Sequence, residues 1–433
     1  MIKYLALNNY GSVLDAKLYF TFGESKAPRG YKDSQLLPFI NIGNTRVVPS
    51  LALIGPNASG KTTLIRSFHT LKNFILRGRN PYNPYRLRVP SLPTTKIEVA
   101  WFEKGIEAEY KYSVEANENG IIYESLQYGL DILFKSQNGQ LSFPALHISE
   151  RDSKKVLDTY DLICVDANKR AQVKSVLAFL VKEWPGLDFR INKAYEFWKD
   201  RVFFYGLDRN EPIFTPNVLT DGIDLLAKTF TDADPAKRDD LAWQLLSKYM
   251  KKLDFSIQRV SCERTKFKSD QFPFPDQLKN LFEDQGLFVN TIKTYHLSET
   301  GESVPFDFSW ESNGTKQLMS ILSYLLTTIR TGGVAIVDEI EESMHTLLVQ
   351  ELIKLFNDKD LNTSKSQIIF TTHNTDLLSD SSLRRSQIAV VSQRGFTGTH
   401  VRRLVDIQGV RQSDDFRQDY LNGYYDALPA AYL

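Results

Sequence analysis

Residues 55–62 read Gly-Pro-Asn-Ala-Ser-Gly-Lys-Thr, which is a complete G-x-x-x-x-G-K-[ST] phosphate loop. The apolar run at 47–54 precedes this loop and predicts a buried strand. The segment at 62–68 follows it with the composition of a helix. Strand, loop and helix in this order distinguish a nucleotide site from a chance match. The segment therefore predicts an α/β fold built around a phosphate-binding loop.

The loop predicts how a nucleoside triphosphate such as ATP would be bound. Backbone N–H groups at the positive end of a helix surround phosphates well. Lys61 is expected to reach the β- and γ-phosphates, and the hydroxyl of Thr62 to hold Mg²⁺. The alternative, a Gly-rich turn with a surface lysine, is disfavoured because the pattern and its flanks agree. The predicted nucleotide-binding residues of this segment are Gly55, Asn57, Ala58, Ser59, Gly60, Lys61, Thr62 and Thr63.

The bulk composition describes an ordinary globular chain. Its 433 residues are enough for two or three domains, with 42% hydrophobic and 24% charged residues. The net charge of +1 gives no general attraction to nucleic acid or to an anionic membrane. The two cysteines, Cys164 and Cys262, lie far apart and fit a reducing compartment. With neither a signal peptide nor an apolar run of about 20 residues, the chain is expected to be cytoplasmic, with no membrane contact.

The order of patterns along the chain predicts three parts. Two strands joined at 9–12, the phosphate loop and an antiparallel β-meander at 95–143 make up residues 1–150. Residues 151–299 are expected to form an inserted helical lobe, with apolar stripes at 173–181 and 241–249. Residues 300–433 return to alternating strands and helices. The expected fold is α/β, with a mostly parallel sheet, the meander and the lobe.

Two further strands carry candidate catalytic residues. Val334–Val337 is an apolar run that ends in Asp338 and Glu339. Because parallel sheets place ligands at the carboxyl ends of their strands, Asp338 is expected to bind Mg²⁺ and Glu339 to activate water. His373 follows the next apolar strand and is expected near the γ-phosphate. The alternatives are a strand that meets a solvated turn, for the two acids, and an ordinary surface histidine.

The segment at 311–318, Glu-Ser-Asn-Gly-Thr-Lys-Gln-Leu, is expected to begin a helix and to provide a second anion-binding site. Ser312 supplies a hydroxyl, and Gly314 leaves the backbone accessible at a positive helix end. A helix cap alone is the other interpretation. A nucleotide bound to the phosphate loop cannot easily contact this second site within the same subunit. Two subunits related by a two-fold axis allow that contact, so we expect a head-to-tail dimer or a larger homo-oligomer.

This order of motifs resembles the ABC-type ATPases of the SMC and RecF branch. More narrowly, the chain looks like the stand-alone AAA ATPases of bacterial abortive-infection and anti-phage systems, relatives of the OLD, Septu, PARIS and retron-associated ATPases. The resemblance implies ATP hydrolysis, a D-loop at 343–345 that faces a second subunit, and a separate effector protein, a nuclease or a toxin. A Q-loop glutamine is also implied, with Gln127 and Gln137 as candidates. The residues that carry it are 311–315, 338–345, 369–374, 383–388 and 420–429.

Two other functions remain open from the sequence. A RecF-like DNA-repair clamp would bind duplex DNA directly, although the neutral charge weighs against it. Basic residues interleaved with tyrosines at 77–88, and the basic segments at 264–268 and 402–403, are candidate nucleic-acid surfaces, with solvated loops as the alternative. A transporter's ATP subunit is disfavoured by the Ser-Asn-Gly segment and by the long insertion.

Overall fold

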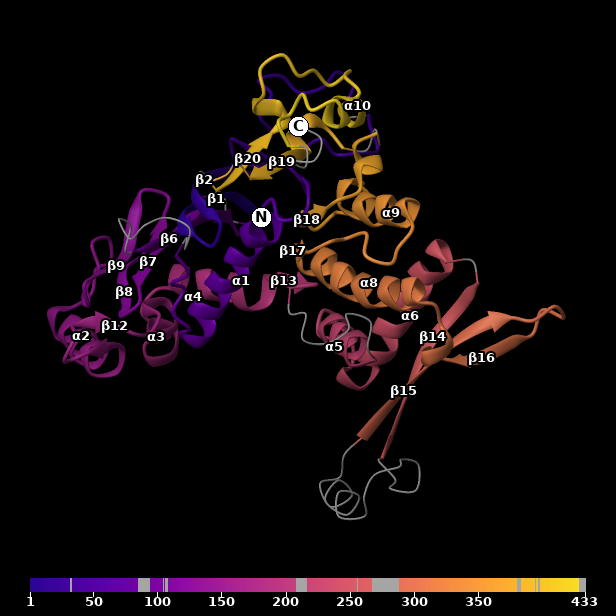
Figure 1. Ribbon diagram of the computed structural model, residues 1–433. Coiled ribbons are helices and arrows are strands. Elements are labelled where there is room, and N and C mark those ends of the chain that lie inside the picture. The colour runs from indigo at the N-terminus through magenta and orange to yellow at the C-terminus, as the bar shows by residue number, and fades with distance from the viewer. Residues whose placement is uncertain are drawn as a thin grey trace. The chain divides into compact units, whose positions relative to one another are not determined.

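The computed structural model describes residues 1–31, 33–84, 94–103, 105, 108–207, 216–254, 256–266, 288–379, 383–393, 395 and 398–427. They form two compact units (Figure 1). The first unit comprises Met1–Leu207, Thr331–Glu341 and Leu352–Leu433, and the second comprises Asp208–Arg330 and Glu342–Glu351. Among the described residues, no helix combines the length and the apolar composition that a membrane span requires.

An antiparallel sheet in the first unit has the order β10-β9-β8-β7-β6-β1-β2. A tight turn joins β7 to β8, and in it Asn117 accepts hydrogen bonds from the N–H groups of Asn119 and Gly120. Its strands are β1 (Ile2–Tyr10), β2 (Val13–Tyr19), β6 (Thr95–Phe102), β7 (Glu109–Asn117), β8 (Gly120–Tyr128), β9 (Asp131–Gln137) and β10 (Gln140–Ser142), and β12 (Ala171–Gln172) pairs with β8 and with β11 (Val165–Asp166).

A second sheet of the first unit has the order β13-β17-β18-β5-β19-β20 and is parallel up to its last pair. Every residue of β5, β17 and β18 is buried, as expected for parallel strands covered on both faces. Their carboxyl ends meet at one edge of the sheet. The strands are β5 (Ser50–Ile54), β13 (Val202–Tyr205), β17 (Val334–Val337), β18 (Gln367–Thr372), β19 (Ile388–Gln393) and β20 (Thr399–Arg403).

Helix α1 (Lys61–Arg77) shares one hydrophobic core with both sheets. Its buried residues Leu64, Phe68 and Leu71 follow the 3.6-residue period. The same core includes Ile97 of the antiparallel sheet and Ile369 of the parallel sheet. Because α1 begins at the phosphate loop, this core fixes the loop relative to the strand ends. The unit also contains α2 (Glu150–Cys164), α3 (Val176–Glu183), α4 (Phe189–Glu196), the π-helix η1 (Phe197–Arg201) and α10 (Phe416–Leu421).

Short elements complete the first unit. They are the hairpin of β3 (Ile40–Ile42) and β4 (Thr45–Val47), and the 3₁₀ turns η5 (Thr375–Leu378), η6 (Arg385–Gln387) and η8 (Leu404–Asp406).

The second unit combines helices with a sheet of order β14-β15-β16. Figure 1 shows β14 and β15 as a long hairpin, with β16 beside β15. The elements are α5 (Pro216–Ala227), η2 (Pro235–Lys237), α6 (Arg238–Leu253), β14 (Ile257–Lys266), β15 (Phe288–Leu297), β16 (Ser303–Asp307), η4 (Phe308–Trp310) and α8 (Asn313–Thr331). Helix α9 (Thr346–Asn357) begins in this unit and ends in the first.

The structure confirms the predicted α/β fold, its mostly parallel sheet and its meander. The compact units divide the chain at other places than the predicted boundaries near 150 and 299, which stay a prediction. Helices α2, α3 and α4 belong to the first unit, because Val156, Leu180 and Ile191 join its core. Strand β14 lies in a region for which helical spacing predicts a helix.

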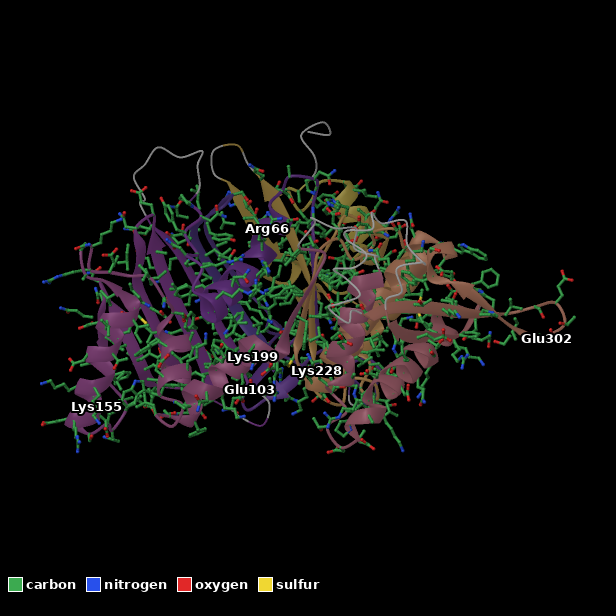
Figure 2. All side chains as sticks on the ribbon, turned by 90° about the horizontal axis from the view of Figure 1, so that it is seen from below. Arg66, Glu103, Lys155, Lys199, Lys228 and Glu302 are labelled. Atoms are coloured by element: carbon green, nitrogen blue, oxygen red, sulfur yellow. The ribbon has the colours of Figure 1, made fainter. Side chains whose placement is uncertain are left out.

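Figure 2 shows exposed side chains such as Lys155 and Glu302 pointing away from the ribbon.

Candidate functional site

The phosphate loop joins β5 to α1 and adopts a conformation that requires glycine. Gly60 has φ of 99°, in the left-handed region, and Ala58 has φ of 60°. A Cβ on Gly60 would lie 2.0 Å from Thr399 Oγ1, and one on Gly55 would lie 2.1 Å from the carbonyl oxygen of Val391. In the described structure no side chain caps α1, so its first N–H groups are left for an anion.

The Lys61 amine lies over this loop. Its Nζ donates to the carbonyl oxygens of Gly55 at 2.7 Å and Pro56 at 2.8 Å, and it is 3.2 Å from His373 Nδ1. Burial lowers the pKa of Lys61 to about 8, while the carboxylate of Glu341 raises it. A bound triphosphate would favour the charged amine, because it supplies opposite charge at short range.

The first acid of the pair is held between the phosphate loop and β18. Asp338 is 2% exposed, and its Oδ1 accepts hydrogen bonds from Thr62 Oγ1 at 3.2 Å and from Thr371 Oγ1 at 2.6 Å. A hydroxyl next to a carboxylate is the type of hard oxygen ligand pair that Mg²⁺ prefers. Thr62 and Asp338 therefore fit a magnesium site.

The second acid points toward the histidine. Glu339 has φ of 49° and donates its N–H to Thr371 Oγ1 at 2.7 Å. Its Oε1 lies 3.8 Å from His373 Nε2, and the two side chains are 30% and 34% exposed. The His373 N–H donates to Glu341 Oε1 at 2.5 Å. A hydrogen bond thus holds the backbone N–H of each candidate catalytic residue, while both side chains remain partly accessible to water.

These residues surround one pocket of about 410 Å³. Ser59 Oγ is buried in the loop and has no hydrogen-bond partner within the described part of the chain. An unsatisfied buried hydroxyl is costly, so a phosphate oxygen at this position would stabilise the loop. The residues fit a magnesium–triphosphate group. The pocket is lined by Ser12, Asn57, Ala58, Ser59, Gly60, Lys61, Thr62, Thr63, Glu339 and His373.

The first unit thus brings together the loop residues, Asp338, Glu339 and His373, as the sequence predicts. The other two predicted residues, Ser312 and Gly314, belong to the second unit. Ser312 caps α8, because its Oγ accepts the N–H of Thr315 at 3.1 Å. A Cβ on Gly314 would lie 2.5 Å from the carbonyl oxygen of Ser343, a residue of the expected D-loop. Glycine therefore lets the start of α8 approach this segment.

The sequence reasoning missed three residues at the site. Thr371 contacts both acids, Ser12 lines the pocket from the β1–β2 turn, and Glu341 holds the backbone of His373. The polar pair Thr371 and Thr372 at the end of an apolar strand was the one signal available for Thr371. The other two depend on contacts between segments far apart in sequence.

Other sequence candidates lie away from the pocket or outside the described residues. Gln127 donates to the carbonyl oxygen of Gly129 in its own hairpin, and Gln137 lies in β9. Neither glutamine is among the residues that line the pocket. In the candidate nucleic-acid surfaces, residues 85–88 and 267–268 lie outside the described residues.

Comparison with known proteins gives one family. Residues 50–380 match the family model described as "AAA domain, putative AbiEii toxin, Type IV TA system". None of the curated proteins matches the chain. Among solved structures, the recombination mediator protein RecF-ATPrS in the RecFOR pathway matches at 12% identity with a TM-score of 0.38. The match covers 93% of this chain and 98% of that one, and a TM-score this low supports no inference.

Proposed function

Since the chain belongs to the AAA-domain family whose model spans residues 50–380, we propose that it hydrolyses ATP and that two copies complete each other's sites head to tail. One observation carries the first half of this proposal. A single pocket is lined by the phosphate loop, Glu339 and His373, with Asp338 bonded to Thr62 beside it. This is the set of groups that phosphoryl transfer to water requires.

In the proposed reaction the protein positions the triphosphate and the attacking water. The loop N–H groups and Lys61 bind the phosphate oxygens and stabilise the charge that spreads over them. Mg²⁺, held by Thr62 and Asp338, would neutralise charge on the β- and γ-phosphates. Glu339 accepts a proton from water, and His373, 3.8 Å from it, donates a hydrogen bond near the γ-phosphate.

Two features of the second unit support the two-copy arrangement. Ser312 and Asn313 are exposed at the start of α8, where the helix dipole favours an anion. Trp310 lies two residues before Ser312 and is 76% exposed. Exposed tryptophan is unusual on a free surface and is enriched at protein interfaces. In the proposed dimer, Ser312 and Gly314 of a second copy bind the γ-phosphate.

The biological role we propose is control of a separate effector in bacterial anti-phage defence. ATP binding closes the dimer and hydrolysis opens it, so an effector that binds one state better is regulated by the nucleotide. The family description, which refers to a toxin and to a Type IV TA system, supports a link to a toxin. That the effector is a separate protein, a nuclease or a toxin, rests on the resemblance in the sequence. The predicted cytoplasmic location is compatible with this role.

Two variants test the proposed reaction. Lys61→Ala should abolish ATP turnover, because the β- and γ-phosphates lose their cation. Glu339→Gln should bind ATP without hydrolysing it and should accumulate as dimers. Turnover by phosphate release and mass by light scattering, each with ATP and with ADP, are the measurements. Parental turnover by Glu339→Gln, or a mass unchanged by ATP, would contradict the proposal.

A further inference from the structure

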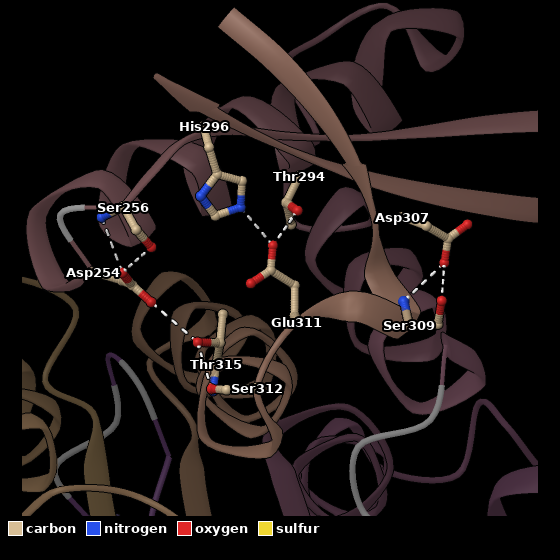
Figure 3. A network of polar contacts seen from close by, with 9 residues as sticks. All are labelled: Asp254, Ser256, Thr294, His296, Asp307, Ser309, Glu311, Ser312 and Thr315. Carbon is tan, nitrogen blue, oxygen red and sulfur yellow. Dashed lines mark hydrogen bonds and ion pairs between the residues drawn. The ribbon is translucent and has the colours of Figure 1, made fainter. Parts of the chain in front are cut away.

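The residue that precedes Ser312 is anchored to the long strand β15. Glu311 Oε1 accepts hydrogen bonds from Thr294 Oγ1 and, at 2.7 Å, from His296 Nε2 (Figure 3). The Glu311 side chain is 8% exposed and that of His296 is 20% exposed. Two donors on one strand therefore hold a nearly buried carboxylate at the entrance of α8. Hydrogen bonds to a charged acceptor are about twice as strong as neutral ones.

A second contact holds the other side of the same helix end. The Ser312 hydroxyl donates to Thr315 Oγ1 at 3.0 Å, and Thr315 Oγ1 donates to Asp254 Oδ2 at 3.2 Å. Asp254 follows α6 and also accepts from the N–H and the hydroxyl of Ser256 (Figure 3). The direction of the Ser312 hydroxyl thus depends on a chain of contacts within the second unit.

We infer that Glu311 is a positioning residue for Ser312, and that β15 sets the place of Ser312 in the ATP site. This inference rests on the proposed function, because Ser312 acts there on the γ-phosphate bound by a second copy. Ser312 itself is exposed, so packing does not fix it. The position of Ser312 is set instead by its neighbour Glu311, which is hydrogen-bonded to β15. A displacement of β15 along its own direction would move Glu311 and hence Ser312, which couples the β14–β15 hairpin to ATP turnover.

The test compares Glu311→Ala with two related variants. Glu311→Ala should lower kcat by about tenfold to a hundredfold, since a small misplacement of a group at the reacting phosphate is sufficient for that loss. Affinity for ADP, which lacks the γ-phosphate that Ser312 would contact, should stay unchanged because the phosphate loop is intact. Glu311→Gln keeps an oxygen acceptor for Thr294 and His296, and should restore most of the turnover.

Asp307→Ala is the matched control. Asp307 also accepts two hydrogen bonds, from the N–H and the hydroxyl of Ser309, but neither joins Ser312 to β15. It should therefore leave kcat near the parental value. Should Glu311→Ala melt well below the parent, Thr294→Val gives the same comparison with one of the two donors removed.

A double-mutant cycle with Ser312→Ala separates this inference from the function on which it rests. If Glu311 acts through Ser312, Glu311→Ala should change kcat by about twofold or less once Ser312 is alanine. If the two substitutions lowered kcat by independent factors that multiply, the inference would be wrong. It would also be wrong if Ser312→Ala lowered kcat and Glu311→Ala did not. Either result would leave the proposed two-copy site standing. Unchanged turnover in Ser312→Ala itself would instead overturn the proposed two-copy site.

Discussion

At the residue scale, one threonine connects the two acids of the site. Thr371 is fully buried in β18, donates to Asp338 Oδ1 and accepts the N–H of Glu339. One hydroxyl thus orients the expected magnesium ligand and fixes the backbone of the expected base. Because β17 and β18 are parallel neighbours, their carboxyl ends lie side by side, and this brings Thr371 next to Asp338 and Glu339.

We predict that Thr371→Val lowers ATP turnover by about tenfold to a hundredfold, as is typical when a partner of a metal ligand is lost. Valine has nearly the same shape, so the fold should be retained, although the N–H of Glu339 loses its acceptor. Steady-state phosphate release measures the effect. The neighbouring Thr372→Val is the control, because the Thr372 hydroxyl accepts the N–H of Asn374 instead. Equal losses in the two variants would contradict a specific role for Thr371.

Local motifs in the sequence identify five residues of the candidate site, whose roles stay predictions. Lys61, Thr62, Asp338, Glu339 and His373 each lie at the end of a recognisable strand or loop, and the structure places them in one region of the first unit. Thr371, Ser12 and Glu341 could not be assigned in this way. Their positions depend on which strands are neighbours, and that is decided by tertiary packing.

At the element scale, helix α1 joins the nucleotide pocket to the core. Its first turn directly follows the phosphate loop, and its later turns pack in the shared core. Lys72, in the fourth turn, donates to the carbonyl oxygens of Val202 at 2.6 Å and Lys199 at 3.3 Å. Burial lowers the pKa of Lys72 to about 8, while Asp200 raises it. The amine thus links α1 to the start of β13, at a cost in desolvation.

The Lys72 shift predicts a pH dependence of stability. Between pH 8 and the ordinary lysine pKa of 10.5, the unfolded chain keeps a proton that the folded chain has lost, so stability rises with pH in that window. The free energy of unfolding of the parent relative to Lys72→Met should therefore increase, by at most about 1.4 kcal/mol per pH unit. Urea unfolding of both proteins from pH 7 to 10 measures it. A constant or falling difference would contradict the assignment.

Strands and helices were predicted best where the pattern of apolar residues was unambiguous. Strand β17 is found at Val334–Val337, as its unbroken apolar run predicts. The expected apolar stripe at 241–249 lies in α6, and Asp234 caps the short 3₁₀ turn that precedes this helix. The expected stripe that begins at Val173 belongs to α3, which starts at Val176, and Val173 is 42% exposed. Strand β14 was missed because its polar residues, such as Gln258 and Glu263, leave no sustained apolar alternation.

At the scale of the whole molecule, the chain carries the two halves of the proposed site in different compact units. The phosphate loop and both acids belong to the first unit, and Ser312 and Gly314 belong to the second. In the proposed dimer, the second half acts on the nucleotide of another copy. The alternative function, a RecF-like DNA clamp, also uses an ATP-closed dimer and is distinguished by direct binding to duplex DNA that weakens steeply with salt.

Mixing two inactive variants tests the proposed dimer most directly. Lys61→Ala lacks the phosphate cation. Ser312→Asp keeps a helix cap but places negative charge where the γ-phosphate would bind. Each alone should be inactive. In an equimolar mixture half of the dimers are mixed, and each has one intact site of two, so about a quarter of the parental ATP turnover should return. A mixture that stays inactive although mixed dimers form, or a Ser312→Asp protein that is active by itself, would show that Ser312 does not act on the nucleotide of a second copy.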